Sequence, residues 1–157
     1  MKHKVFEILD DLNINYTNYE HQPVHSVLDC KGIDIPGQRV KSLLIRNKKG
    51  TNFYMVVLGE DKKLETNKIR EIFDDSKMSF LEEELMMEKI CLKPGSVSPF
   101  ALINNKDKDI KVVFEKNLKG ALIGFHPLQN DNTVVLQMDD VERFLKNLGF
   151  EFVYGDL

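Results

Sequence analysis

Residues 40 to 58 read VKSLLIRNKKGTNFYMVVL and predict a β-hairpin. Two apolar runs that favour strands, Val40 to Arg46 and Phe53 to Leu58, lie on either side of the turn sequence Asn47-Lys48-Lys49-Gly50. Lys41 interrupts the first run, which otherwise continues through Leu43, Leu44 and Ile45. A lysine in such a run usually points outward with its stem along apolar surface, although at the mouth of a cleft it can pair with a negative charge.

Helical and extended patterns alternate around this hairpin. Val5, Leu9 and Leu12 fall on one helical face and predict an N-terminal helix. Ser79 with Glu82 resembles a capping box at the start of a later helix. The further predicted strands are Tyr16 to Glu20, Phe100 to Ile103, Lys111 to Phe114, Ala121 to Phe125 and Thr133 to Gln137, and the further predicted helices run from Ser26 to Gly32, from near Thr66, from Ser79 to Ile90 and from Asp139 to Leu148.

This order of elements predicts an α/β fold. Strands and helices alternate without a strict βαβ rhythm, which favours a central mixed sheet with helices packed around it. The 157 residues contain no repeat, low-complexity tract or linker, so we expect a single domain over residues 1–157. No apolar run approaches the ~20 residues of a membrane span. The N-terminus begins an amphipathic helix rather than a signal sequence, and a cytoplasmic protein is therefore expected.

Basic residues are concentrated in one segment of an acidic chain. The net charge is −3, but residues 39 to 70 hold nine basic and three acidic residues of the totals of 22 and 25. A local positive face on an acidic body suits an enzyme that contacts a few phosphates, and a solvated lysine-rich hairpin is the simpler alternative on charge alone. The candidate phosphate-binding residues are Lys48, Lys49, Lys62 and Lys63.

The loop Gly95-Ser96-Val97-Ser98-Pro99 is the second candidate for chemistry. Successive backbone N–H groups of a glycine-containing turn can converge on a carbonyl oxygen or on a developing oxyanion. Gly95 permits an unusual backbone dihedral, and Pro99 stiffens the exit of the loop. As an isolated pattern, this loop is more simply a plain connection between two elements.

Three segments together resemble the active-site framework of the YbaK/prolyl-tRNA-synthetase-associated domain family, in particular its freestanding prolyl-tRNA editing branch. They are Val40-Lys41-Ser42-Leu43-Leu44, Lys93-Pro94-Gly95-Ser96-Val97-Ser98-Pro99-Phe100 and Gly124-Phe125-His126-Pro127-Leu128. The resemblance extends from the residues around Tyr19 to the last helix. It implies a mixed-sheet α/β fold with a cleft at the sheet edge. It also implies hydrolysis of the ester that joins a wrong amino acid, most closely alanine, to the tRNA for proline.

The resemblance also implies roles for individual residues. Lys41 matches the lysine that the family requires for deacylation, while Ser42 stands where its relatives usually carry asparagine. The loop of Gly95, Ser96, Val97, Ser98 and Pro99 matches the substrate loop that holds the aminoacyl group. His126 is expected to form a wall of the amino-acid pocket rather than to act as the general base, with Val24 as a weaker wall candidate.

Neither a metal nor an organic cofactor is expected. His21, His25 and Cys30 suggest zinc, but Pro23 breaks their helical spacing and no fourth ligand is evident. No glycine fingerprint for phosphate follows a strand.

Two alternative functions remain open at this point. One is a deacylase for another mischarged amino acid, namely cysteine, serine or threonine. The other is a non-catalytic module that binds tRNA or prolyl-tRNA synthetase.

Overall fold

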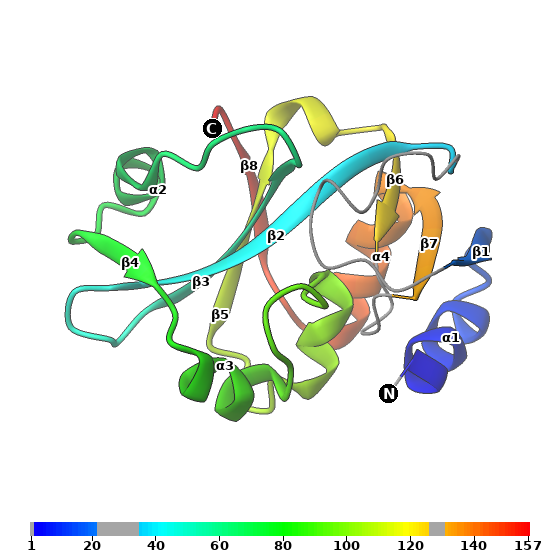
Figure 1. The fold of residues 1–157 in the computed structure, drawn as a ribbon, viewed down its shortest axis with the longest axis horizontal. Helices are drawn as coiled ribbons and strands as arrows, with labels where there is room; N and C mark the ends of the chain where they lie inside the picture. Colours follow the sequence, from blue (N-terminus) through cyan, green and yellow to red (C-terminus); the bar gives the residue numbers. More distant parts are fainter. Residues whose placement is uncertain (1, 22–34, 126–130) are drawn as a thin grey trace.

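One mixed β-sheet forms the centre of the structure, a computed structural model that describes residues 2–21, 35–125 and 131–157 (Figure 1). Along this sheet the strands follow the order β1-β7-β6-β2-β3-β5-β8, and β4 pairs with β2 outside that path. Parallel pairs, such as β3 with β5, occur beside antiparallel pairs, such as β2 with β3. The strands are β1 (Tyr16–Glu20), β2 (Gln38–Asn47), β3 (Phe53–Gly59), β4 (Met78–Phe80), β5 (Ile110–Glu115), β6 (Leu122–Phe125), β7 (Asn132–Gln137) and β8 (Phe152–Gly155).

Helices surround this sheet, as the sequence predicts for the α/β class. In Figure 1, α1 and α4 lie near β1, β7 and β6, whereas α2 lies beside β4. The helices are α1 (Lys2–Asp11), α2 (Thr66–Phe73), α3 (Glu83–Ile90) and α4 (Met138–Leu148), with 3-10 helices η2 (Pro99–Asn104) and η3 (Lys116–Leu118). None of the helices in these ranges is long and apolar enough to cross a membrane.

The predicted hairpin is confirmed, and its first strand connects two parts of the sheet. β2 pairs in parallel with β6 only at Gln38 and Arg39 and with β4 only from Ile45 to Asn47, while β3 accompanies it from Val40 to Arg46. Between the β6 and β4 pairings, residues 40 to 44 have no strand partner besides β3 in the described part of the chain. On this side of β2, its two end segments therefore pair with different strands, and its middle segment pairs with neither of them. Figure 1 shows β2 crossing the molecule.

Two apolar cores lie on opposite faces of this hairpin. Met55 and Val57 belong to the larger core, which includes Phe100 and Phe144. Tyr54 and Val56 face the smaller core with Ile69 of α2. Because β3 is buried on both faces, its sequence is apolar throughout instead of alternating.

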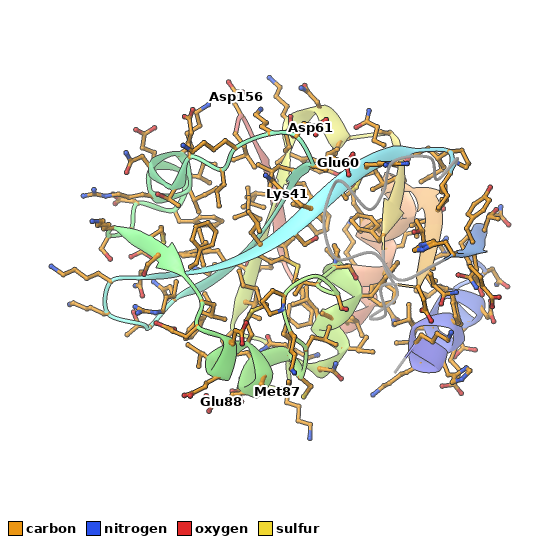
Figure 2. All side chains as sticks on the ribbon, in the orientation of Figure 1. Lys41, Glu60, Asp61, Met87, Glu88 and Asp156 are labelled. Atoms are coloured by element: carbon orange, nitrogen blue, oxygen red, sulfur yellow. The ribbon has the colours of Figure 1, made fainter. Side chains whose placement is uncertain are left out.

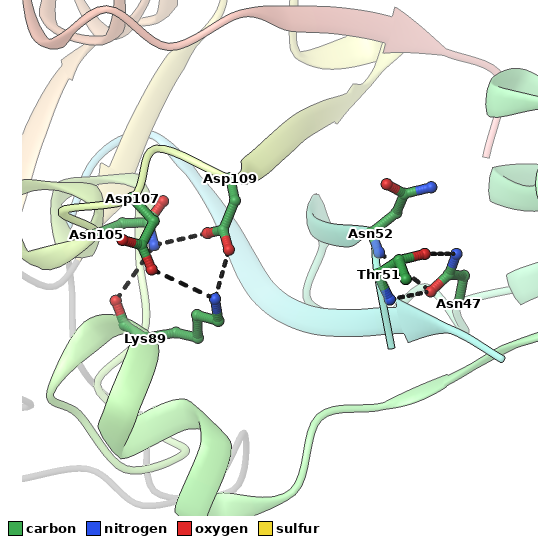
Figure 3. Close-up of polar contacts among 7 residues, drawn as sticks. All are labelled: Asn47, Thr51, Asn52, Lys89, Asn105, Asp107 and Asp109. Atoms are coloured by element: carbon green, nitrogen blue, oxygen red, sulfur yellow. Dashed lines mark hydrogen bonds and ion pairs between the residues drawn. The ribbon is translucent and has the colours of Figure 1, made fainter. Parts of the chain in front are cut away.

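Two polar clusters fix the turns at one end of the sheet (Figure 3). The Asn47 side chain accepts hydrogen bonds from the backbone N–H groups of Thr51 (2.9 Å) and Asn52 (3.1 Å), which closes the hairpin turn. Lys89 at the end of α3 forms an ion pair with Asp109, immediately before β5. These contacts fix the β2–β3 turn and join the end of α3 to the start of β5.

Several predicted elements need correction. The strand predicted from Phe100 to Ile103 is wrong, because Pro99 opens the 3-10 helix η2; its fixed φ suits the first turn of a helix. The capping box is also wrong: Ser79 lies in β4, and α3 begins after Glu82, which makes no side-chain capping bond. β4 and β8 were not predicted, since such short strands carry little periodic signal. The helix predicted from Ser26 to Gly32 lies outside the described residues.

Candidate functional site

A pocket lies where β2 begins, close to β6. The pocket opens beside residues 40 to 44 of β2, which pair only with β3 among the strands of the described ranges. Within the described ranges, its lining consists of residues 35–40 and Ser42, Glu60 after β3, Val97 and Ser98, Gly124 and Phe125 of β6, and His21 with Thr133.

The loop before η2 supplies one wall of this pocket. Val97 and Ser98 line it, and Ser98 is buried in an extended conformation immediately before the first residue of η2, Pro99. Gly95 adopts a φ of +98°, in the left-handed region that favours glycine, as the sequence predicts for this loop. Gly95 is exposed, and neither it, Ser96 nor Pro99 is among the lining residues. The structure therefore brings two residues of the predicted substrate loop to the pocket.

His21 and Thr133 form a polar pair on another wall. His21 follows β1, and its Nε2 lies 2.8 Å from Oγ1 of Thr133 on β7. The backbone N–H of His21 also donates to the carbonyl of Asp131 (2.9 Å). Sequence reasoning considered His21 only as a zinc ligand. Its pairing with Thr133 depends on the β1–β7 ladder, which joins segments more than 100 residues apart.

Gly124 leaves the room that the His21–Thr133 pair needs. A Cβ atom at this position would lie 3.0 Å from Cγ2 of Thr133, closer than ordinary van der Waals contact. We expect Gly124→Ala to lower the free energy of unfolding by about 1–2 kcal/mol through this overpacking. Thermal unfolding measures the loss.

A second substitution tests the assigned cause. Thr133→Ser removes the methyl group in question and keeps the hydroxyl beside His21. When Gly124→Ala is added to the Thr133→Ser protein, the free energy of unfolding is expected to fall by less than half of the loss that Gly124→Ala causes in the wild type. An undiminished cost would contradict the proposed clash.

Glu60 and Arg39 bring opposite charges to the pocket lining, and sequence reasoning assigned neither of them. The backbone N–H of Glu60 donates to the Arg39 carbonyl (3.2 Å), so the β2–β3 pairing continues one residue beyond β3. Burial raises the pKa of Glu60 and Asp61 raises it further, while Arg39 opposes the change. The lining thus contains a carboxyl group in partly desolvated surroundings.

Lys41 lies between two lining residues, Val40 and Ser42, but does not itself line the pocket. Side chains of consecutive strand residues leave on opposite faces, so Lys41 lies on the face opposite to Val40 and Ser42 and on the same face as Arg39, which also lines the pocket. Lys41 is half-buried, and its side chain makes no hydrogen bond or ion pair with any residue that the structure describes. Its proposed catalytic role stays a prediction. Figure 2 shows Lys41, Glu60 and Asp61 near one another, where β3 ends beside β2.

The predicted tRNA-binding lysines occupy two separate places. Lys62 and Lys63 follow the pocket residue Glu60, and Lys62 forms an ion pair with Glu115 (3.2 Å). Lys48 and Lys49 are exposed in the hairpin turn, at the other end of β2. His126 and Val24, the two predicted wall residues, lie outside the described residues, as do His25 and Cys30. Within the described part, no three His, Cys, Asp or Glu side chains form a group that could hold a metal ion.

Comparison with known proteins identifies the family of this chain. Residues 21–144 match the model of the aminoacyl-tRNA editing domain. The chain belongs to the aminoacyl-tRNA editing domain family. The match covers His21, the whole β2–β3 hairpin, the Val97–Ser98 loop and β6, and so includes the described lining of the pocket.

Matches to individual relatives extend over nearly the whole chain. This chain is 37% identical over 154 residues to the prolyl-tRNA editing protein ProX of Acetoanaerobium sticklandii, and the match covers 96% of this chain and 94% of the relative. It is 26% identical over 151 residues to prolyl-tRNA synthetase associated domain-containing protein 1 of Danio rerio, covering 93% and 82% of the two chains. These relatives confirm the family that the three sequence segments resemble.

Solved structures share the editing-domain fold. A protein proposed to be a trans-editing enzyme for prolyl-tRNA synthetase superimposes with a TM-score of 0.70 at 14% identity, covering 96% of this chain and 93% of that chain. A hypothetical protein of known crystal structure superimposes with a TM-score of 0.75 at 18% identity, covering 97% and 98%. At such low identity the likeness shows the fold alone, and it confirms the predicted α/β architecture.

Proposed function

We propose that this chain is a freestanding editing hydrolase that removes alanine from mischarged tRNA for proline. The family match and the 37% identity to a prolyl-tRNA editing protein support the reaction class and the tRNA. The observation that carries the proposal is the pocket, where the start of β2, the Val97–Ser98 loop and Gly124 of β6 meet. These are the segments whose sequences resemble the editing framework. The proposed enzyme acts as a single domain in the cytoplasm.

The proposed reaction is hydrolysis of an aminoacyl ester. Water attacks the ester carbonyl carbon, the bond between that carbon and the ribose oxygen breaks, and the ribose hydroxyl takes up a proton. An aminoacyl ester is already activated, so a positioned water and a stabilised oxyanion suffice without a covalent nucleophile. Backbone N–H groups of the Gly95–Pro99 loop, which reaches the pocket through Val97 and Ser98, stabilise the carbonyl oxygen. Lys41 anchors the nearby phosphate or orients the reacting end.

Alanine is the proposed amino acid because editing is needed where binding discriminates weakly. A synthetase pocket built for proline rejects a smaller side chain by only about 1–3 kcal/mol, and a second pocket that excludes the larger amino acid completes the selection. His126 and Val24 are proposed as walls of this second pocket, together with the Gly95–Pro99 loop. Ser42 lines the described pocket and supplies a hydroxyl where relatives usually carry an amide.

A comparison of mischarged substrates tests this assignment. We expect hydrolysis of alanyl-tRNA for proline to exceed that of the cysteinyl, seryl and threonyl esters of the same tRNA by about tenfold or more, the discrimination that one or two methylene-sized differences allow. Initial rates of release of labelled amino acid, each corrected for spontaneous hydrolysis, measure it. Faster release of cysteine would move the enzyme to another substrate class, and tight tRNA binding without any release would favour a binding module.

The mischarged tRNA is the proposed partner, with two basic contact points. Lys62 and Lys63 lie beside the pocket residue Glu60, whereas Lys48 is six residues along the hairpin from Ser42, or roughly 20 Å at the rise of an extended strand. We propose that Lys48 and Lys49 contact phosphates farther from the aminoacyl end than Lys62 and Lys63 do. Prolyl-tRNA synthetase is a second proposed partner, which would deliver the mischarged product.

A further inference from the structure

We infer that the carboxylate of Glu60 receives the α-ammonium group of the aminoacyl substrate. The inference rests on the proposed function and names the group that recognises the charged end of the amino acid. An aminoacyl ester carries a cationic ammonium next to the carbonyl that water attacks. A pocket that orients this carbonyl therefore gains from a negative charge placed beside it.

Glu60 is the acidic member of the described pocket lining. The other charged side chain there belongs to Arg39, which cannot attract an ammonium group. The carboxylate of Glu60 forms no hydrogen bond or ion pair with the residues that the structure describes. A carboxylate in this position retains capacity for a ligand.

A buried glutamate holds the turn that carries Glu60. Glu115, at the end of β5, is 7% exposed and accepts a hydrogen bond from the backbone N–H of Gly59 (2.9 Å) through Oε1. Its Oε2 accepts from Nζ of Lys62 (3.2 Å). The backbone N–H of Lys62 donates to the Gly59 carbonyl (3.0 Å), which closes a four-residue turn from Gly59 to Lys62. Glu115 therefore contacts both ends of this turn.

The fixed turn presents Glu60 in a defined place. Arg39 holds the Glu60 backbone from the β2 side, while Glu115 holds the residues on either side of Glu60 and Asp61. A charged group fixed in advance costs less entropy when the substrate binds than one on a mobile loop. Partial burial raises the pKa of Glu60 even though Arg39 opposes the change, so this carboxylate has lost part of its water and gains from a further cationic partner.

The test compares two esters of the same tRNA that differ only at the charged group. Alanyl-tRNA carries the ammonium, whereas lactyl-tRNA carries a hydroxyl of similar size in its place. For Glu60→Gln, kcat/KM for alanyl-tRNA is expected to fall about 10- to 100-fold, the range for a hydrogen bond between charged groups. For lactyl-tRNA it should change less than threefold. Each rate is corrected for spontaneous hydrolysis.

Asp61→Asn is the matched control, because it removes the same charge from the neighbouring position outside the pocket lining. It is expected to change neither rate more than twofold. Equal losses on both esters in Glu60→Gln, no loss on alanyl-tRNA, or the same selective loss in Asp61→Asn would overturn the inference. Wild-type protein that leaves alanyl-tRNA intact would instead contradict the proposed function. Equal thermal midpoints of the variants show that the comparison concerns folded protein.

Discussion

Lys41→Ala is expected to lower kcat/KM for alanyl-tRNA for proline by about 10²- to 10³-fold, the usual cost of removing one group that stabilises charge in a transition state. Lys41 lies on β2 between Val40 and Ser42, which line the pocket, and on the strand face of Arg39, which also lines it. Its flexible stem therefore starts beside the place where the ester would bind. Single-turnover release of labelled alanine measures the loss.

Lys4→Ala is the control for net charge, because Lys4 is exposed on α1 and outside the pocket lining. It should leave the rate within twofold of the wild type. Because the Lys41 side chain forms no hydrogen bond or ion pair with the described residues, the Lys41→Ala protein is expected to keep its thermal midpoint within a few degrees. Wild-type rates in Lys41→Ala would remove this lysine from the mechanism.

Asp75→Asn is expected to cause the largest loss of stability, about 2–4 kcal/mol, since several hydrogen bonds to one carboxylate are disturbed together. Oδ2 of Asp75 accepts from the hydroxyl of buried Tyr54 (2.5 Å) and from Asn52 (3.0 Å). Oδ1 accepts from buried Asn47 (3.1 Å) and from the backbone of Ser76 (2.7 Å). An amide at this position would direct its N–H groups at some of these donors.

The same carboxylate gives stability a defined pH dependence. Hydrogen bonds, first of all from Tyr54, lower the pKa of Asp75 below its ordinary value. A lowered native pKa contributes stability above the unfolded pKa of about 4, and that contribution is lost as the pH falls toward the native value. The free energy of unfolding of the wild type, measured by urea titration, should therefore fall below about pH 5. The difference in this free energy between wild type and Asp75→Asn should shrink over the same range.

Asp74→Asn is the matched control for this experiment, because it removes the neighbouring exposed carboxylate and because asparagine tolerates the positive φ of 49° at this position. It should cost less than 1 kcal/mol. A loss in Asp74→Asn as large as that in Asp75→Asn, or a difference between wild type and Asp75→Asn that persists unchanged to pH 3, would contradict the role given to the Asp75 cluster.

Local sequence patterns predict the elements whose signals are complete within a few residues. The β2–β3 hairpin has both apolar strands and its turn in one stretch, and α4 ends before Gly149, which adopts the positive φ of 87° typical of a helix C-terminus. The strand predicted from Phe100 was wrong, because the same apolar residues can be buried in a 3-10 helix and Pro99 decides between the two. β8 has four residues, too few for periodicity to distinguish.

The candidate site was predictable where it follows contiguous motifs. The β2 segment around Lys41, the Val97–Ser98 loop and Gly124 each belong to a stretch that resembles the editing framework, and the pocket adjoins all three. Glu60 and the His21–Thr133 pair were missed, because their place in the pocket depends on strand pairing and on a turn held by Glu115. Such long-range contacts leave no spacing pattern in a single sequence.

The most direct test of the central claim compares alanyl-tRNA for proline with correctly charged prolyl-tRNA at equal concentrations. The proposed editing function predicts rapid release of alanine by the wild-type protein. It also predicts that proline release does not exceed spontaneous hydrolysis, because the pocket must spare the correct product. Equal release of both amino acids, or release of neither, would contradict the assignment of this chain as an alanine-specific editing hydrolase.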